Sequence, residues 1–113
     1  MRTALLGCLF LVPAVVVNAG GAPEIYGTLT AGSQDVRQVT VRLACGQSRP
    51  IQTRTDKYGS YRLRPRQSGH CTLTVDAAGC SRPPALDVHA YDKPVRYDLA
   101  LLNRNGVCSL QRR

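Results

Sequence analysis

Hydrophobic and polar residues alternate along most of this chain with a period of two, the pattern of β-strands that bury one face. Between residues 39 and 45, for example, Val39, Val41 and Leu43 alternate with Thr40 and Arg42. No ten-residue window carries apolar side chains at the spacing of an amphipathic helix. The pattern therefore predicts an all-β protein.

Seven strands fit this alternation, and segments rich in turn-forming residues separate them. The strands are predicted at residues 25–30, 39–45, 51–55, 61–65, 71–75, 86–90 and 95–101. Short strands with a turn signal every eight to twelve residues or so are typical of antiparallel sandwiches. We therefore expect residues 20–113 to form one seven-stranded antiparallel β-sandwich.

The first residues have the composition of a secretory signal. Arg2 precedes an apolar run over residues 4–17, and the small residues Val17 and Ala19 form a cleavage site. The run is interrupted by Pro13 and is shorter than the ~20 residues that cross a membrane. We therefore predict that residues 1–19 are a signal peptide, that the protein is periplasmic or secreted, and that no segment spans the membrane.

Composition indicates a small core that needs covalent support. The 113 residues include no Trp and one Phe, and a domain of this size buries too little apolar surface for large stability. Four cysteines follow the signal segment: Cys45, Cys71, Cys80 and Cys108. In an oxidising compartment an even set of this kind is expected to form two disulfides, and spacing alone leaves three pairings open.

One motif resembles a known family. The string Thr55-Asp56-x-x-Gly59-x-Tyr61, with strands at residues 26–29, 39–43 and 73–75, looks like the carboxypeptidase regulatory-like domain of the prealbumin, or transthyretin-like, sandwich. In that family this string forms a tight turn between two strands. Asp56 would cap the turn, Gly59 would take a positive φ and Tyr61 would enter the core. The cysteine positions also resemble the pollen-allergen-like branch. Either resemblance implies a non-catalytic module.

The resemblance also implies which strands are neighbours. The second strand would pair with the third and fifth, the fifth with the sixth, and the first, fourth and seventh would form the opposing sheet. In that arrangement Cys45 lies beside Cys71, and Cys80 is left to pair with Cys108.

The residues themselves offer little catalytic chemistry. The serines lie in predicted loops and turns without a nucleophile-elbow motif, and neither His70 nor His89 has another ligand at metal-binding spacing. Transthyretin-like hydrolases end in Tyr-Arg-Gly-Ser, whereas this chain ends in Ser109-Leu110-Gln111-Arg112-Arg113. The sequence therefore predicts no catalytic residues, no metal and no cofactor.

Positive charge is the remaining chemical signal, with a formal net charge of +8. Arg62, Arg64 and Arg66 alternate along the fourth strand, and Arg96 shares their sheet and outward side. One interpretation is attraction to anionic polymers; the other is a solvated arginine-rich surface. Nucleic acid is disfavoured because few aromatic side chains are available for stacking among these arginines.

These observations favour an exported, non-catalytic sandwich with a binding or structural role, in contact with a protein partner or a glycan. Two alternatives stay open. The first is a basic binder of anionic envelope polysaccharide or lipopolysaccharide, and the second is an enzyme or enzyme inhibitor of unrecognised type. Binding to a polymer through arginine should weaken steeply with salt, whereas an apolar protein interface should not.

The signal segment gives the first testable prediction. If the Val17-x-Ala19 site is cleaved, the exported protein begins at Gly20. Intact-mass measurement of the exported protein checks this, and a mass that retains residues 1–19 would contradict the signal-peptide interpretation.

Overall fold

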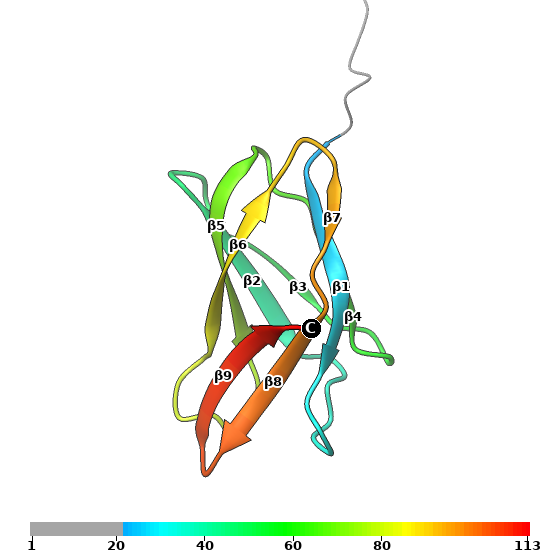
Figure 1. The fold of residues 1–113 in the computed structure, drawn as a ribbon, viewed down its shortest axis with the longest axis vertical. Coiled ribbons are helices and arrows are strands. Elements are labelled where there is room, and N and C mark those ends of the chain that lie inside the picture. The colour runs from blue at the N-terminus through cyan, green and yellow to red at the C-terminus, as the bar shows by residue number, and fades with distance from the viewer. Residues whose placement is uncertain (1–21) are drawn as a thin grey trace, which may run out of the picture.

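The computed structural model describes residues 22–113, so the predicted signal peptide lies outside the described residues. Two sheets face each other, and no helix occurs in the described part (Figure 1). One of them, which we call the second sheet, has the order β3 (Ile51–Arg54), β2 (Thr40–Cys45), β5 (Gly69–Asp76) and β6 (Ala85–Ala90), with every pair antiparallel.

The first sheet is centred on β1 (Glu24–Thr30). On one side β1 pairs with β4 (Ser60–Leu63). On the other side it pairs first with β7 (Pro94–Arg96) and then with β8 (Leu99–Arg104). The last strand, β9 (Val107–Arg112), forms a hairpin with β8. The all-β sandwich and the predicted strand neighbours are therefore confirmed.

The core lies between the two sheets and is built from the inward residues of the alternating pattern. Ile25 and Leu29 of β1, Leu43 of β2, Leu73 of β5 and Leu99 of β8 are fully buried. Burial of each such side chain contributes roughly 1.5–3 kcal/mol relative to exposure.

The predicted disulfides are also confirmed. Cys45 and Cys71 are register partners on β2 and β5, with Cα atoms 4.2 Å apart, and Cys80 is bonded to Cys108. The bonded residues are 26 and 28 positions apart in sequence. In the chain-entropy model each closed loop of this length contributes about 3.5 kcal/mol by restricting the unfolded chain.

The predicted strand count is wrong, because the described residues, 22–113, form nine strands rather than seven. The strand expected at residues 95–101 is divided into β7 and β8 at Tyr97 and Asp98, and both parts pair with β1 in parallel. The sandwich is therefore not purely antiparallel.

The division of this strand depends on Gly27. A Cβ atom on residue 27 would lie 2.1 Å from the carbonyl oxygen of Tyr97. The segment around Tyr97 can therefore approach β1 this closely only because residue 27 is a glycine. The Tyr97 N–H donates to the Tyr26 carbonyl (2.8 Å), and the buried Tyr61 hydroxyl donates to the Tyr97 carbonyl (2.6 Å). Both backbone groups of Tyr97 therefore have hydrogen-bond partners even though the strand is interrupted there.

The sequence contained an unused signal for β9. Asn105 and Gly106 have φ values of 55° and 91° and form the two-residue turn between β8 and β9. Asn-Gly favours the turn with two positive φ angles that suits a tight hairpin. The strand was missed because only Cys108 and Leu110 supply its inward apolar positions, and Val107 is exposed.

Tyr61 is buried, as predicted, and it gives the next prediction. Tyr61→Ala should lower the free energy of unfolding by roughly 3–5 kcal/mol because it leaves a cavity. Tyr61→Phe should lower it by about 1–3 kcal/mol because the Tyr97 carbonyl loses its donor. Urea unfolding checks both values, with Tyr58→Ala as the control because Tyr58 is 72% exposed. Wild-type stability in Tyr61→Ala would show that the register of β4 is wrong.

Candidate functional site

A row of three side chains crosses the outer face of the first sheet: Arg62 on β4, Tyr26 on β1 and Arg96 on β7. Tyr26 is the register partner of both arginines. Neighbouring strands are about 4.8 Å apart, so the arginine backbones are separated by about 10 Å. Each guanidinium carbon lies 6.0 Å from the centre of the Tyr26 ring. We call these residues the arginine–tyrosine row.

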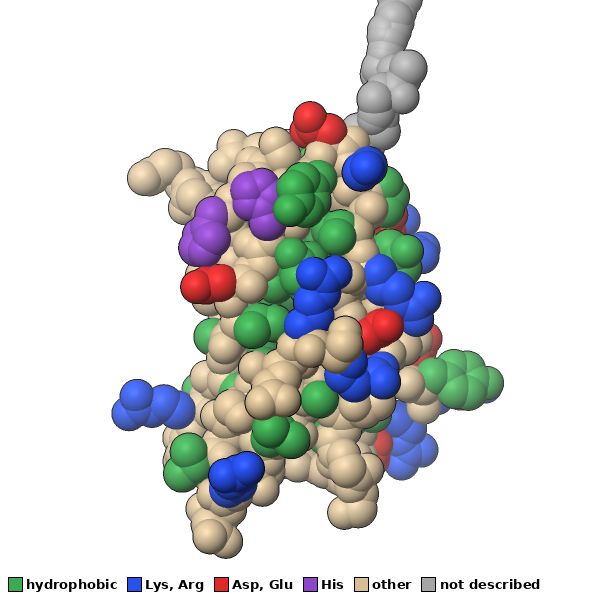
Figure 2. Space-filling model, in the orientation of Figure 1, with side chains coloured by type: hydrophobic (Ala, Val, Ile, Leu, Met, Phe, Trp, Pro, Cys, Tyr) green, Lys and Arg blue, Asp and Glu red, His purple; other side chains and the backbone are tan. Residues whose placement is uncertain are grey.

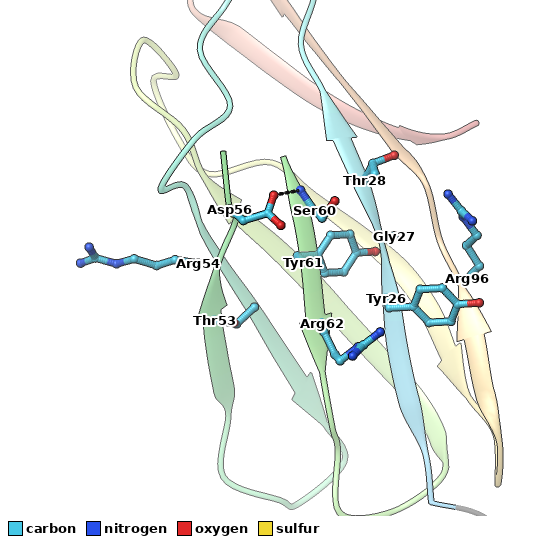
Figure 3. A pocket seen from close by; sticks show the side chains of 10 residues that line it. All are labelled: Tyr26, Gly27, Thr28, Thr53, Arg54, Asp56, Ser60, Tyr61, Arg62 and Arg96. Carbon is cyan, nitrogen blue, oxygen red and sulfur yellow. Dashed lines mark hydrogen bonds between the residues drawn. The ribbon is translucent and has the colours of Figure 1, made fainter. Parts of the chain in front are cut away.

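An open groove of about 470 Å³ lies along this row (Figure 3). Its wall carries the hydroxyl groups of Thr28, Thr53 and Ser60. Arg54 belongs to the rim, but its side chain points away from the row (Figure 3). The lining also includes Asp56 and the buried Tyr61. The two guanidinium groups of the row, beside several hydroxyl groups, suit an anionic, hydroxyl-rich ligand.

Two carboxylates hold the arginines of the row in place. Glu24 Oε2 lies 2.5 Å from Arg62 Nε and 3.9 Å from Arg64 Nη2. This oxygen is buried and accepts no hydrogen bond, so its contacts with Arg62 and Arg64 are ion pairs. Both Asp98 carboxylate oxygens accept from Arg96 Nε, at 3.1 and 2.9 Å.

Both carboxylates contact Nε, which leaves the terminal amino groups available, and the Arg62 and Arg96 side chains are 60% and 59% exposed. Within residues 22–113 these amino groups of Arg62 and Arg96 donate no hydrogen bond. A ligand anion can therefore bind guanidinium groups that are already oriented, which reduces the entropy lost on binding.

Asp98 also ties the row to the neighbouring strands. Its Oδ1 accepts from the Thr28 N–H (2.9 Å) and from the Thr28 hydroxyl (3.2 Å). The hydrogen bond from the Thr28 N–H, together with those from Arg96 and the Thr28 hydroxyl, lowers the pKa of Asp98. Arg113, which follows β9, donates to the same hydroxyl (3.0 Å).

The four predicted anion-binding arginines do not form one cluster. Arg62 and Arg96 flank Tyr26, and Arg64 shares Glu24 with Arg62. Arg66 lies apart, on a smaller cleft lined by Ser48 and Arg49. The interpretation from sequence gave Tyr26 no role, although its outward position on a strand was readable from the alternation.

The string from Thr55 to Tyr61 forms the tight turn between β3 and β4 and the start of β4. Asp56 Oδ1 accepts from the Tyr58 and Ser60 N–H groups, both at 2.9 Å, and so caps the turn between β3 and β4. Gly59 has a φ of 80°, and a Cβ there would lie 2.6 Å from the Leu29 carbonyl oxygen. The buried Thr55 hydroxyl accepts from the Val39 N–H and donates to the Val36 carbonyl, both in the connection between β1 and β2.

Three further features of the described residues concern metal ligands, membrane-spanning helices and disulfides. As the side chains lie, no three His, Cys, Asp or Glu residues between positions 22 and 113 are placed to hold a metal ion. No helix among them has the length and apolar character to cross a membrane. The two disulfides are typical of proteins in an oxidising, extracytoplasmic environment.

Comparison with known proteins identifies the fold. No family model matches the chain, and no curated protein matches it. Among solved structures, the chain is similar to 5-hydroxyisourate hydrolase from Klebsiella pneumoniae, with a TM-score of 0.57 and 18% sequence identity. The likeness covers 80% of this chain and 92% of the hydrolase chain. The protein therefore has a transthyretin-like fold.

This similarity corrects the functional prediction made from the sequence. We expected a non-catalytic binding or structural module because the family resemblance implied one. That expectation is wrong, since the same sandwich carries an enzyme in the Klebsiella protein. Function has to be argued from the side chains of a site, because one fold can carry many functions.

Asp98 gives a prediction about pH. Its pKa is lowered in the folded protein, so its ionised form stabilises the fold above the unfolded pKa of about 3.9, and this contribution is lost as pH falls through the folded pKa. Asp98→Asn should therefore unfold more easily than wild type at pH 7, by about 1 kcal/mol after allowance for solvent screening.

Thermal unfolding from pH 7 down to pH 2 measures this difference, which should shrink in the acidic range. Asp92→Asn, in an exposed turn, serves as the control. A difference between wild type and Asp98→Asn that stays constant over the whole range would contradict the role of the charge.

Proposed function

We propose that the arginine–tyrosine row and its groove bind an anionic glycan of the cell envelope, such as an acidic polysaccharide or the phosphorylated sugars of lipopolysaccharide. The observation that carries this proposal is the placement of Tyr26 between two guanidinium groups, each oriented by a carboxylate.

The chemistry of the row fits such a ligand. The terminal amino groups of Arg62 and Arg96 match carboxylate or phosphate oxygens in a planar, two-point geometry. The half-buried Tyr26 ring offers a flat surface for the apolar face of a sugar and a hydroxyl for its polar edge. The hydroxyl groups of Thr28 and Ser60 can exchange hydrogen bonds with sugar hydroxyls.

The charge of the whole chain supports the same ligand class. A net charge of +8 attracts polyanions over a distance of about one Debye length. The row then supplies the contacts at short range. Because the attraction comes from guanidinium groups, the affinity should fall steeply with ionic strength.

The proposal also places the protein at the envelope. It is supported by the signal-like residues 1–19 and by two disulfides, which persist outside the cytoplasm. Within the transthyretin-like sandwiches we assign the chain to the carboxypeptidase regulatory-like branch. That assignment is based on the string from Thr55 to Tyr61, whose turn is capped by Asp56.

A second candidate function is an enzyme that acts on a ligand in this groove. It is favoured by the hydrolase that shares the fold. A binder would return its ligand unchanged, whereas a hydrolase would release shortened or altered products. The same binding experiment therefore separates the two candidates when the ligand is recovered afterwards.

The test measures binding to immobilised polygalacturonate and lipopolysaccharide, with neutral dextran as the reference surface. Arg62→Gln and Arg96→Gln should each weaken binding by roughly tenfold or more, as expected for loss of a charged hydrogen bond. Tyr26→Ala should weaken it comparably. Arg104→Gln is the matched control, because Arg104 is an exposed arginine at the end of β8.

Equal losses in Arg104→Gln and Arg62→Gln would show that only net charge matters, and that outcome would refute the proposed groove. Binding to neither anionic surface at low salt would refute the ligand class. Product release from either glycan would favour the enzyme.

A further inference from the structure

The outer face of the second sheet brings both histidines of the chain together. His70 on β5 and His89 on β6 are direct register partners. Figure 2 shows the two histidines as neighbours on one exposed face. Because they are nineteen positions apart, their spacing along the chain gave no sign of this contact.

The hydrogen bonding of β6 shows how close these side chains are. The His89 N–H donates to the Tyr97 hydroxyl (3.0 Å), on the open edge of β6 and away from β5. His70 and His89 therefore form a non-hydrogen-bonded pair, the kind in which opposite side chains lie closest. In such pairs the Cβ atoms are about 4.5–5.5 Å apart, which lets two imidazoles reach one ion.

A carboxylate stands beside this pair. Asp87 precedes His89 by two positions, so both side chains point to the same face of β6. Asp87 Oδ1 lies 3.5 Å from His70 Nε2. The His70 and Asp87 side chains are 68% and 79% exposed, so neither is locked in place by packing.

We propose that His70, His89 and Asp87 form a surface site for a divalent transition metal ion such as Zn²⁺ or Cu²⁺. Imidazole nitrogen and carboxylate oxygen are ligands that these ions accept, and water would complete the coordination. The site is independent of the arginine–tyrosine row, which lies on the other sheet.

One side chain must turn for the three donors to converge. The His89 ring lies against Tyr91, with ring centres 4.6 Å apart and planes tilted by 49°. Rotation about the side-chain bonds of His89 releases it from this exposed tyrosine. The backbone positions are fixed by the β5–β6 ladder, so the metal needs only a change of side-chain rotamer.

Calorimetric titration of the untagged protein with ZnCl₂ or CuCl₂ tests the site. We expect one ion per chain, and His70→Asn and His89→Asn should each weaken binding by roughly tenfold or more. Asp87→Asn should weaken it less. Asp76→Asn, on the same face at the far end of β5, is the control and should bind as wild type.

Two further measurements keep the site falsifiable. Cu²⁺ should broaden the amide NMR signals around residues 70 and 87–89 before all others. The Tyr91→Ala variant should bind Zn²⁺ or Cu²⁺ at least as tightly as wild type, because the His89 ring no longer packs against Tyr91. Unchanged affinity in both histidine variants, or no binding at millimolar Zn²⁺ and Cu²⁺, would overturn the proposal. Circular dichroism of each variant checks that the sheet is intact.

Discussion

The close approach of the Tyr97 carbonyl to Gly27 is the contact on which the first sheet depends. A side chain at position 27 would occupy the space that this carbonyl fills. Because the segment between β7 and β8 approaches β1 at this point, β1 can pair with β7 along one half and with β8 along the other. The Tyr61 hydroxyl then satisfies the carbonyl from within the core. The same segment directs Asp98 outward to Arg96, so the core contact also positions the candidate site.

The two sheets are joined by more than apolar packing. The Tyr97 hydroxyl accepts from the His89 N–H of β6, so a residue of the first sheet covers part of an exposed edge of the second. Arg112 packs over the Tyr97 ring, 4.0 Å from its centre. The Cys80–Cys108 bond ties β9 to the connection between β5 and β6. These links are valuable in a small domain, where the apolar core alone contributes limited stability.

Both outer faces carry chemistry, and it differs between them. The first sheet presents arginines that are held by carboxylates around a tyrosine, an arrangement suited to anions. The second sheet presents two imidazoles and a carboxylate, which are metal ligands. In both places the residues that meet come from different strands, so each grouping is created by strand pairing rather than by proximity in sequence.

Alternation of apolar and polar residues was enough to predict the sandwich, because burial of one strand face requires a period of two. It also placed Tyr61 in the core and Arg62 outside it. It failed at residues 95–101, where the strand is divided at Tyr97 and Asp98 although the alternation continues on either side of the break. It also failed at β9, where few inward residues are apolar, even though Asn105-Gly106 marked the hairpin.

The sequence by itself determined the class of fold, the outward side of Arg62 and Arg96 and, through the family resemblance, the pairing of the cysteines. Only the tertiary structure decided which side chains meet. Tyr26 lies between Arg62 and Arg96, and His70 lies opposite His89, because cross-strand neighbours depend on the register of each ladder. Register is set by long-range contacts such as that of Gly27 with Tyr97, and a one-residue shift would move every side chain to the other face.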